Sequence, residues 1–117
     1  MVKKEVLVVN YQTLDGIIEK EFTVLIGQNA KENTLLIKES SDPDNLWFHF
    51  EKVSGPHIIL ESGKCVIPKR YTQEVASKLF KYKKNVQDNV IYTEVKNVKL
   101  TKTDGLVIPI NTRVIKF

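Results

Sequence analysis

The sequence predicts an α+β fold with a mainly antiparallel sheet, one long helix and one short helix. Short runs rich in β-branched and aromatic residues recur along most of the chain. Asp-Gly pairs at 15–16 and 104–105 are typical of hairpin turns. Helical spacing of apolar residues extends over several turns in one stretch, residues 73–86.

The first half of the chain combines strands with the short helix. Strands are expected at 6–9, 22–26, 46–50 and 57–60, with a hairpin turn at Asp15-Gly16 between the first two. Asn29 can cap a short helix, and Glu32 three residues later completes a capping box. Leu35 and Leu36 would lie on the buried side of that helix.

The second half begins with the long helix and returns to strands. Thr72 is the expected N-cap, following Pro68, which ends the segment 65–67. The helical stripe that faces the core would consist of Val75, Leu79, Tyr82 and Val86. Strands are expected at 90–92, 98–101, 106–110 and 112–117. Pro109 should lie at a sheet edge or a bulge.

The chain has 117 residues, a formal net charge of +4 and one cysteine, Cys65. This length fits a single domain, expected to span residues 1–117. One cysteine allows no internal disulfide, which favours a reducing, cytoplasmic location. No run of about 18 apolar residues is present, so we expect no contact with a membrane interior. The positive charge favours an encounter with a polyanion.

Both histidines and the only tryptophan fall between residues 45 and 57. In a strand, Trp47 and His49 share one face, while Phe48 and Phe50 share the other face and should be core. His57 opens the next strand and would approach His49 if the two strands pair. Because Trp47 shares a face with His49, we expect it to be half-exposed.

Catalytic interpretations of this region are weaker than a structural one. Two imidazoles could bind a metal ion with a carboxylate from Asp42, Asp44 or Glu51, but no metal-binding spacing supports this. The sequence favours structural histidines that are hydrogen-bonded to the backbone over a metal site. Cys65 beside Lys64 could be a reactive thiol, although a lone cysteine is more often a small core residue. We therefore expect no catalytic residue, no metal and no cofactor.

Cations gather on and just before the predicted long helix: Lys69, Arg70, Lys78, Lys81, Lys83 and Lys84. No acidic residue interrupts residues 75–87, and Tyr71 and Tyr82 lie among the cations, where their rings could stack on bases. A second basic stretch contains Lys96, Lys99 and Lys102. Lysines on a helix are most often its solvated face. The arrangement also fits contact with a phosphate backbone.

The segments 27–33, 44–50, 54–60, 74–83 and 90–98, in this order, resemble the NFACT-R domain. This domain occurs in ribosome-associated quality-control factors and in small proteins of the coiled-coil-domain 25 type. The Trp-Phe-His sequence at 47–49 and the histidine at 57 carry most of the resemblance. Two positions depart from it, since Asn45 stands where Asp is more usual and Pro56 replaces the usual Ser.

The resemblance implies a non-catalytic module that binds tRNA or ribosome-associated RNA and serves translation or ribosome quality control. It does not by itself select RNA over DNA. The peptide-tailing activity of the large factors is not implied for this chain. The binding residues would be Trp47, His49 and His57 on the motif face and Arg70, Lys78, Lys81, Lys83 and Lys84 at the phosphates.

Two other functions remain open from the sequence. The first is a protein-interaction module that docks on ribosome-associated proteins through exposed strand edges or through Trp47. The second is a metal-assisted phosphoester hydrolase that uses His49 and His57.

Overall fold

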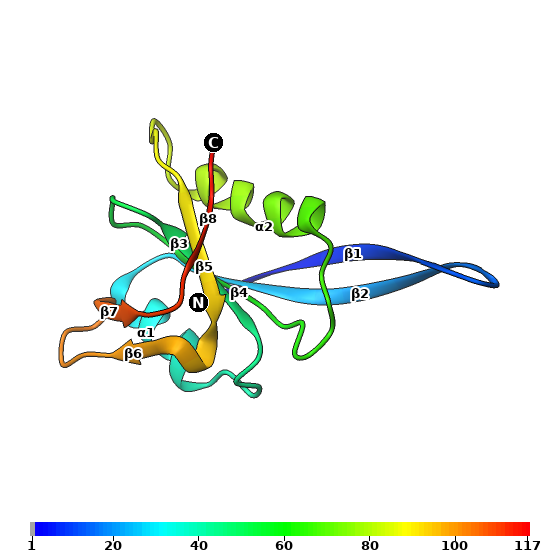
Figure 1. Ribbon diagram of the computed structural model, residues 1–117. Helices are drawn as coiled ribbons and strands as arrows, with labels where there is room; N and C mark the ends of the chain where they lie inside the picture. The colour runs from blue at the N-terminus through cyan, green and yellow to red at the C-terminus, as the bar shows by residue number, and fades with distance from the viewer. Residues whose placement is uncertain (1) are drawn as a thin grey trace.

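The computed structural model describes residues 2–117 and confirms the α+β fold class (Figure 1). The strands are β1 (Lys3–Thr13), β2 (Gly16–Gly27), β3 (Leu46–Phe50), β4 (His57–Leu60), β5 (Val90–Glu94), β6 (Val98–Leu100), β7 (Val107–Pro109) and β8 (Arg113–Ile115). The helices are α1 (Ala30–Lys38), α2 (Lys69–Tyr82) and the single 3-10 turn η1 (Val95–Asn97). Neither α1 nor α2 is long and apolar enough to cross a membrane.

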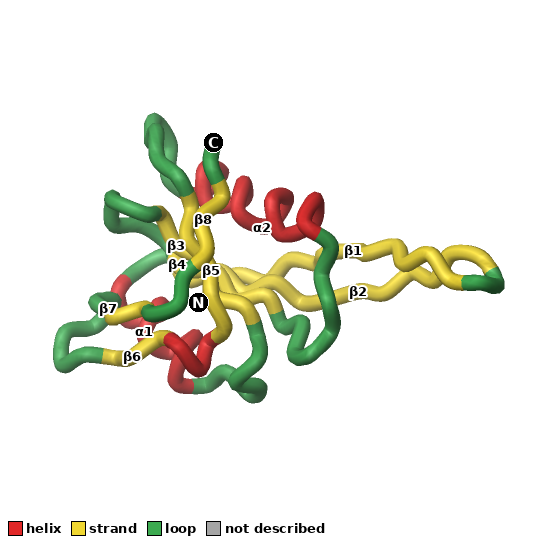
Figure 2. The backbone as a smooth tube through the Cα atoms, in the orientation of Figure 1, coloured by secondary structure: helices red, strands yellow, loops and turns green. Residues whose placement is uncertain are grey.

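Six antiparallel strands form the main sheet, in the order β1-β2-β4-β3-β5-β8, and β6 and β7 form a separate hairpin. Figure 2 shows the helices α1 and α2 on opposite sides of the main sheet. The strands β3 and β4 are therefore covered on both faces, which explains why they read as nearly continuous apolar runs. Pro109 ends β7, an edge strand, as expected.

The first two strands form an arm that projects from the body (Figure 1). The strand β1 pairs with β2 along its whole length, from Lys3 opposite Ile26 to Thr13 opposite Gly16. Gly16 has a φ of 123°, a conformation that glycine adopts at little cost, so the predicted Asp-Gly turn is confirmed. The arm contributes to a longest dimension of 49 Å against 30 and 28 Å.

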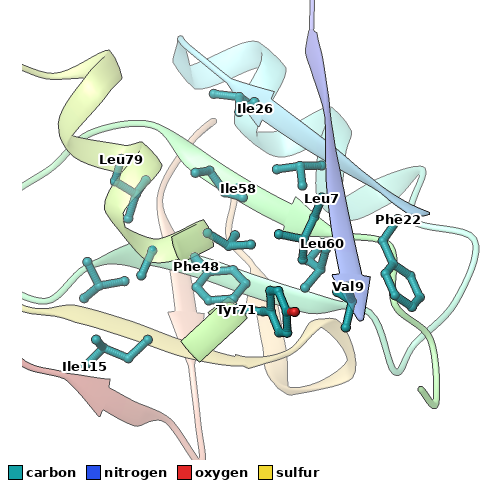
Figure 3. Packing of buried hydrophobic residues seen from close by; sticks show 14 of the residues in the cluster. Leu7, Val9, Phe22, Ile26, Phe48, Ile58, Leu60, Tyr71, Leu79 and Ile115 are labelled. Atoms are coloured by element: carbon teal, nitrogen blue, oxygen red, sulfur yellow. The ribbon is translucent and has the colours of Figure 1, made fainter. Parts of the chain in front are cut away.

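The larger core lies between the main sheet and α2 (Figure 3). Phe48 and Phe50 point into it and are fully buried, which confirms the predicted core face of β3. From α2, Val75 and Leu79 are also fully buried. Tyr82 and Val86 are partly buried against the same cluster, although Val86 lies beyond the end of the helix.

The smaller core lies on the opposite face of the sheet, under α1, η1 and β6. Its buried residues are Leu36, Ile37, Trp47, Ile59, Val95 and Val98. The alternation of side chains along β3 therefore places neighbouring residues in two different cores. Trp47 is 1% exposed, so the expectation that it would be half-exposed is wrong.

The first helix begins as the sequence predicted but turns a different face to the sheet. The side-chain Oδ1 of Asn29 accepts a hydrogen bond of 2.9 Å from the backbone N–H of Glu32, which confirms the N-cap. The Glu32 carboxylate accepts from the N–H of Gln28 at 3.0 Å, whereas a capping box would use the N–H of the N-cap residue Asn29. Leu36 is buried, but Leu35 is 44% exposed, because adjacent helical residues point about 100° apart.

The second helix begins four residues earlier than expected. Pro68 is the N-cap, and its φ of −57° already suits the start of a helix. Thr72 lies inside the first turn, where its hydroxyl donates to the carbonyl of Lys69 at 2.8 Å. The helix ends at Tyr82 rather than at residue 86, and Asn85 then takes a left-handed conformation with a φ of 60°.

Candidate functional site

Three rings meet on one face of the paired strands β3 and β4. Phe48 lies opposite Ile58 in this ladder, so His49 and His57 fall at the adjacent position. The two imidazole centroids are 4.7 Å apart, which confirms the expected approach. The indole of Trp47 stacks on His49 with centroids 5.7 Å apart and an interplanar angle of 9°.

The hydrogen bonds of these rings define which nitrogen carries the proton. Trp47 Nε1–H donates to Nδ1 of His57 at 3.1 Å, so this nitrogen is unprotonated and the proton lies on Nε2. His49 Nδ1 lies 2.7 Å from the carbonyl oxygen of Phe50. Because a carbonyl only accepts, His49 carries its proton on Nδ1 and its Nε2 is an acceptor.

Both imidazoles are neutral at pH 7. Burial, with a smaller contribution from the adjacent His49, lowers the pKa of His57 to about 3. Burial also lowers the pKa of His49, although the bond to the Phe50 carbonyl acts in the opposite direction. The contact of His49 with a backbone carbonyl fits the structural interpretation of the histidines.

Within residues 2–117, no group of three or more His, Cys, Asp or Glu side chains is arranged to hold a metal ion. The metal-assisted hydrolase that the sequence left open therefore lacks a third ligand in this part of the chain. Cys65 lies exposed, outside both cores, so the interpretation of it as a small core residue is wrong.

The two histidines line a groove of about 620 Å³. Its apolar lining includes the buried Trp47 and the half-buried Ile91. One wall is the start of α1 together with the β6–β7 hairpin, and the other wall is the loop 51–55. The hydroxyl oxygen of Thr34 in α1 accepts from the N–H of Gly105 at 2.9 Å and so holds the hairpin against the helix.

Asn33 of α1 joins the floor of the groove to its loop. Its Oδ1 accepts from the backbone N–H of His57 at 3.2 Å, and its Nδ2 donates to the carbonyl of Gly55 at 3.4 Å. The side chain fits only because residue 27 is glycine, since a Cβ there would lie 2.3 Å from Asn33 Oδ1. Spacing in the sequence gave no signal for this role, because the contact depends on how α1 meets β4.

The loop 51–55 is held from its other side by residues that follow α2. The Asp88 carboxylate accepts from the backbone N–H groups of Lys52 and Val53 at 2.7 and 3.0 Å. The ammonium group of Lys83 donates to the carbonyl of Ser54. Lys83 therefore connects the basic helix to the groove, a relationship that the sequence analysis did not foresee.

The cations of α2 are not equally free. The Glu5 carboxylate from β1 lies 2.7 Å from the ammonium of Lys78 and 3.2 Å from that of Lys81, and the Tyr82 hydroxyl also bonds to it. The contact with Lys78 is the largest of the effects that hold the pKa of Glu5 at about 2. The Lys78 side chain is 19% exposed and that of Lys81 is 60% exposed. Two of the predicted cations thus share one carboxylate.

The remaining predicted cations lie on the surface. Lys84 is exposed, and the exposed Arg70 places its guanidinium 4.7 Å from the ring centroid of Tyr71. Tyr71 is 8% exposed, so its ring is covered and does not stack on a base. In the second basic stretch, Lys96 pairs with Asp44 at 2.9 Å.

Asn45 and Pro56, the two departures from the NFACT-R pattern, are both buried. Asn45 accepts from the N–H of Gly63 at 2.9 Å and donates to the Ser40 hydroxyl at 3.2 Å. It therefore ties the loop before β3 to the loop after β4. An aspartate could not provide the second of these bonds when ionised.

Comparison with known proteins identifies the family. The NFACT protein RNA binding domain matches residues 8–115, and the chain belongs to this family. It is 26% identical over 93 residues to the Rqc2 homolog RqcH of Bacillus subtilis (strain 168), which covers 76% of this chain and 15% of that protein. It is 30% identical over 99 residues to coiled-coil domain-containing protein 25 of Mus musculus, which covers 78% of this chain and 47% of that protein.

The chain thus spans less than half the length of these curated relatives. A solved structure, the C-terminal part of the fibronectin/fibrinogen-binding protein from Streptococcus suis, matches with a TM-score of 0.67. The match covers 91% of this chain and 43% of that chain at 20% sequence identity, which shows a common fold.

Proposed function

We propose that this protein is a non-catalytic RNA-binding module that acts in translation or ribosome quality control in the cytoplasm. Its ligand in this proposal is tRNA or ribosome-associated RNA. The observation that carries the proposal is the family match over residues 8–115. The similarity to RqcH supports it, as does the formal net charge of +4, which favours association with a phosphate chain.

The proposal divides the expected site residues into two groups. We assign the phosphate contacts to Arg70, Lys81, Lys83 and Lys84, and their position on or near the surface of α2 and the segment after it supports this assignment. Lys78 adds positive potential but mainly holds α2 to β1 through Glu5. Trp47 and His57 are buried and fix the shape of the groove, and His49 reaches its surface.

Salt-dependent binding tests this assignment. The variant Lys81→Gln/Lys84→Gln is compared with Lys20→Gln/Lys38→Gln, which removes the same charge from exposed positions on β2 and α1. Removing one cation from a phosphate should reduce the slope of log affinity against log salt by roughly 0.7 to 0.9. An equal change of slope in both variants would show that α2 is not the binding surface.

The nature of the ligand is tested in the same assay. A tRNA should bind more tightly than a DNA hairpin of matched length and charge, because the proposal assigns the site to RNA. Equal affinity would reduce the proposal to a general polyanion-binding module. Metal analysis and turnover measurements on protein without a histidine tag test the hydrolase alternative, which requires stoichiometric metal.

The projecting arm favours a second candidate function, docking on a larger protein assembly. Leu14 is 105% exposed, Ile17 68% and Ile18 51%, which is an unusual concentration of apolar surface at one tip. In this proposal the arm, and not Trp47, is the anchor. A pull-down that survives nuclease treatment and is lost in Leu14→Ser/Ile17→Ser would support it. Loss of the pull-down on nuclease treatment alone would assign the association to RNA.

A further inference from the structure

The groove between α1 and the loop 51–55 presents one hydrogen-bond donor beside one acceptor. The donor is Nε2–H of His57, because its Nδ1 accepts from Trp47. The acceptor is Nε2 of His49, because its Nδ1 is bonded to the Phe50 carbonyl. The two rings are 4.7 Å apart, so a single planar ligand can meet both.

These two nitrogens are available to a ligand. Within residues 2–117, neither Nε2 has a hydrogen-bond partner in the protein. In that part of the chain, the one completely buried side-chain polar atom without a partner is Oγ of Ser62. Both Nε2 atoms therefore keep some exposure to the groove, which both rings line. Polar atoms left unbonded in a mostly apolar site mark a place where a ligand supplies the missing bonds.

The charges along the groove argue against a phosphate inside it. The charged residues that line it are Glu51, Lys52 and Asp104, and all three are exposed. Two carboxylates against one ammonium group give this lining a net negative charge. The part of a ligand that enters is therefore not an anion such as a phosphate, and a neutral base fits this requirement. A volume of about 620 Å³ is ample for one nucleobase and its sugar.

Every RNA base fits this description. Each has a flat apolar face, and each has a donor next to an acceptor on its pairing edge. That edge is free only in an unpaired base. The cations Lys83 and Lys84 follow α2, and Lys83 bonds to the loop that forms the groove wall. A phosphate chain on these cations would pass beside the groove opening.

We propose that the groove takes up one unpaired base of the bound RNA and reads its pairing edge with His49 and His57. The phosphates remain outside on the cations that follow α2. This inference rests on the proposed RNA-binding function and adds the substrate class, an RNA with an exposed single-stranded nucleotide. The neighbouring hydrogen bonds fix the tautomer of each ring, so His57 is the donor and His49 is the acceptor in this site.

Two RNA hairpins of identical length test the inference. One has an ordinary loop, and the other has a loop of abasic nucleotides, which keeps every phosphate and removes the bases. The wild-type protein should bind the ordinary loop more tightly by on the order of tenfold in fluorescence anisotropy. Equal affinity for the two hairpins would overturn the inference and leave the proposed RNA binding intact. Failure to bind either hairpin would overturn both.

Substitutions then locate the effect. His49→Phe keeps an aromatic ring and removes the acceptor, so it should lower the affinity for the ordinary loop by a larger factor than the affinity for the abasic loop. Lys81→Gln/Lys84→Gln should weaken binding of both hairpins by the same factor. A full preference in His49→Phe would assign base recognition to another surface. The wild-type comparison needs no substitution, so equal affinity for the two hairpins would still overturn the inference if His49→Phe fails to fold.

Discussion

Trp47 and His57 are joined by a buried hydrogen bond of 3.1 Å that runs between the side chains of the adjacent strands β3 and β4. The two residues are 1% and 2% exposed, so water cannot replace the bond on either side. A buried polar group that loses its partner costs about 1–3 kcal/mol. The bond therefore fixes both the strand pairing and the proton position on His57.

A double-mutant cycle measures this coupling. Trp47→Phe leaves Nδ1 of His57 without a donor, and His57→Leu leaves the indole N–H without an acceptor. Each single variant should lower the free energy of unfolding by at least about 1–3 kcal/mol in urea denaturation followed by circular dichroism. The double variant should be more stable than the sum of the two losses implies, because no orphaned group remains. Strict additivity would contradict the proposed coupling.

Gly27→Ala tests the contact that positions Asn33. A Cβ at residue 27 would lie 2.3 Å from Asn33 Oδ1, so the amide must move and release the N–H of His57. We expect a loss of about 1–3 kcal/mol in the free energy of unfolding. The double variant Gly27→Ala/Asn33→Ala should lose less than the sum of the single variants, because the clash is relieved. The matched control Gly16→Ala meets no atom within 4 Å and tests backbone strain alone.

The stability of the protein should fall as the pH is lowered from 7 to 5. His57 has a pKa of about 3 in the fold against an ordinary value of 6.5, so below pH 6.5 the unfolded chain binds a proton that the folded chain does not. The stabilising contribution is complete above pH 6.5 and is lost progressively toward pH 3. The free energy of unfolding should drop by up to about 1.4 kcal/mol per pH unit in this window. His49 acts in the same direction.

The variant His57→Gln provides the control for this pH dependence. It retains an acceptor near Trp47 but cannot titrate, so its slope of stability against pH should be flatter between pH 5 and 7. Glu5 also has a lowered pKa, about 2, but its contribution is lost only below its ordinary value of 4.5. The window from pH 5 to 7 therefore isolates the histidines. An unchanged slope in His57→Gln would show that this ring is not the titrating group.

Glu5→Gln should separate stability from RNA binding. It removes the charge that Lys78 and Lys81 share, and loss of a hydrogen bond to a charged group costs about 1.5–3 kcal/mol of folding free energy. The same change frees Lys81 for phosphate, so RNA affinity should rise at low salt while stability falls. Thermal unfolding and anisotropy titrations measure the two effects. A parallel fall in both would mean that α2 must be held by Glu5 for binding.

Local patterns in the sequence predicted the elements with clear boundaries. The strands 46–50 and 57–60 have the predicted ends, because turn residues bound each apolar run. The cap at Asn29 and the turn at Asp15-Gly16 also follow from short-range chemistry. The start of α2 does not follow from them, because Thr72 has the side chain typical of an N-cap while the helix in fact begins after Pro68.

Long-range packing decided the features that the sequence did not predict. Trp47 is buried because α1, η1 and β6 cover the second face of the sheet. The residue pattern within β3 does not indicate that this face is covered. Along the chain, no acidic residue interrupts residues 75–87. In the fold, the Glu5 carboxylate bonds to the ammonium group of Lys78, although the two residues are 73 positions apart in the sequence. The proximity of His49 and His57 could be anticipated, since it needed only two strands to pair.

The protein has one tryptophan, and it lies at the floor of the groove. All indole emission of the native state therefore comes from a single buried site in contact with an imidazole. A shift in its colour or intensity on addition of a ligand would report events at this floor without any attached dye. The same signal would not change for a molecule that touches only the distant tip of the β1–β2 arm.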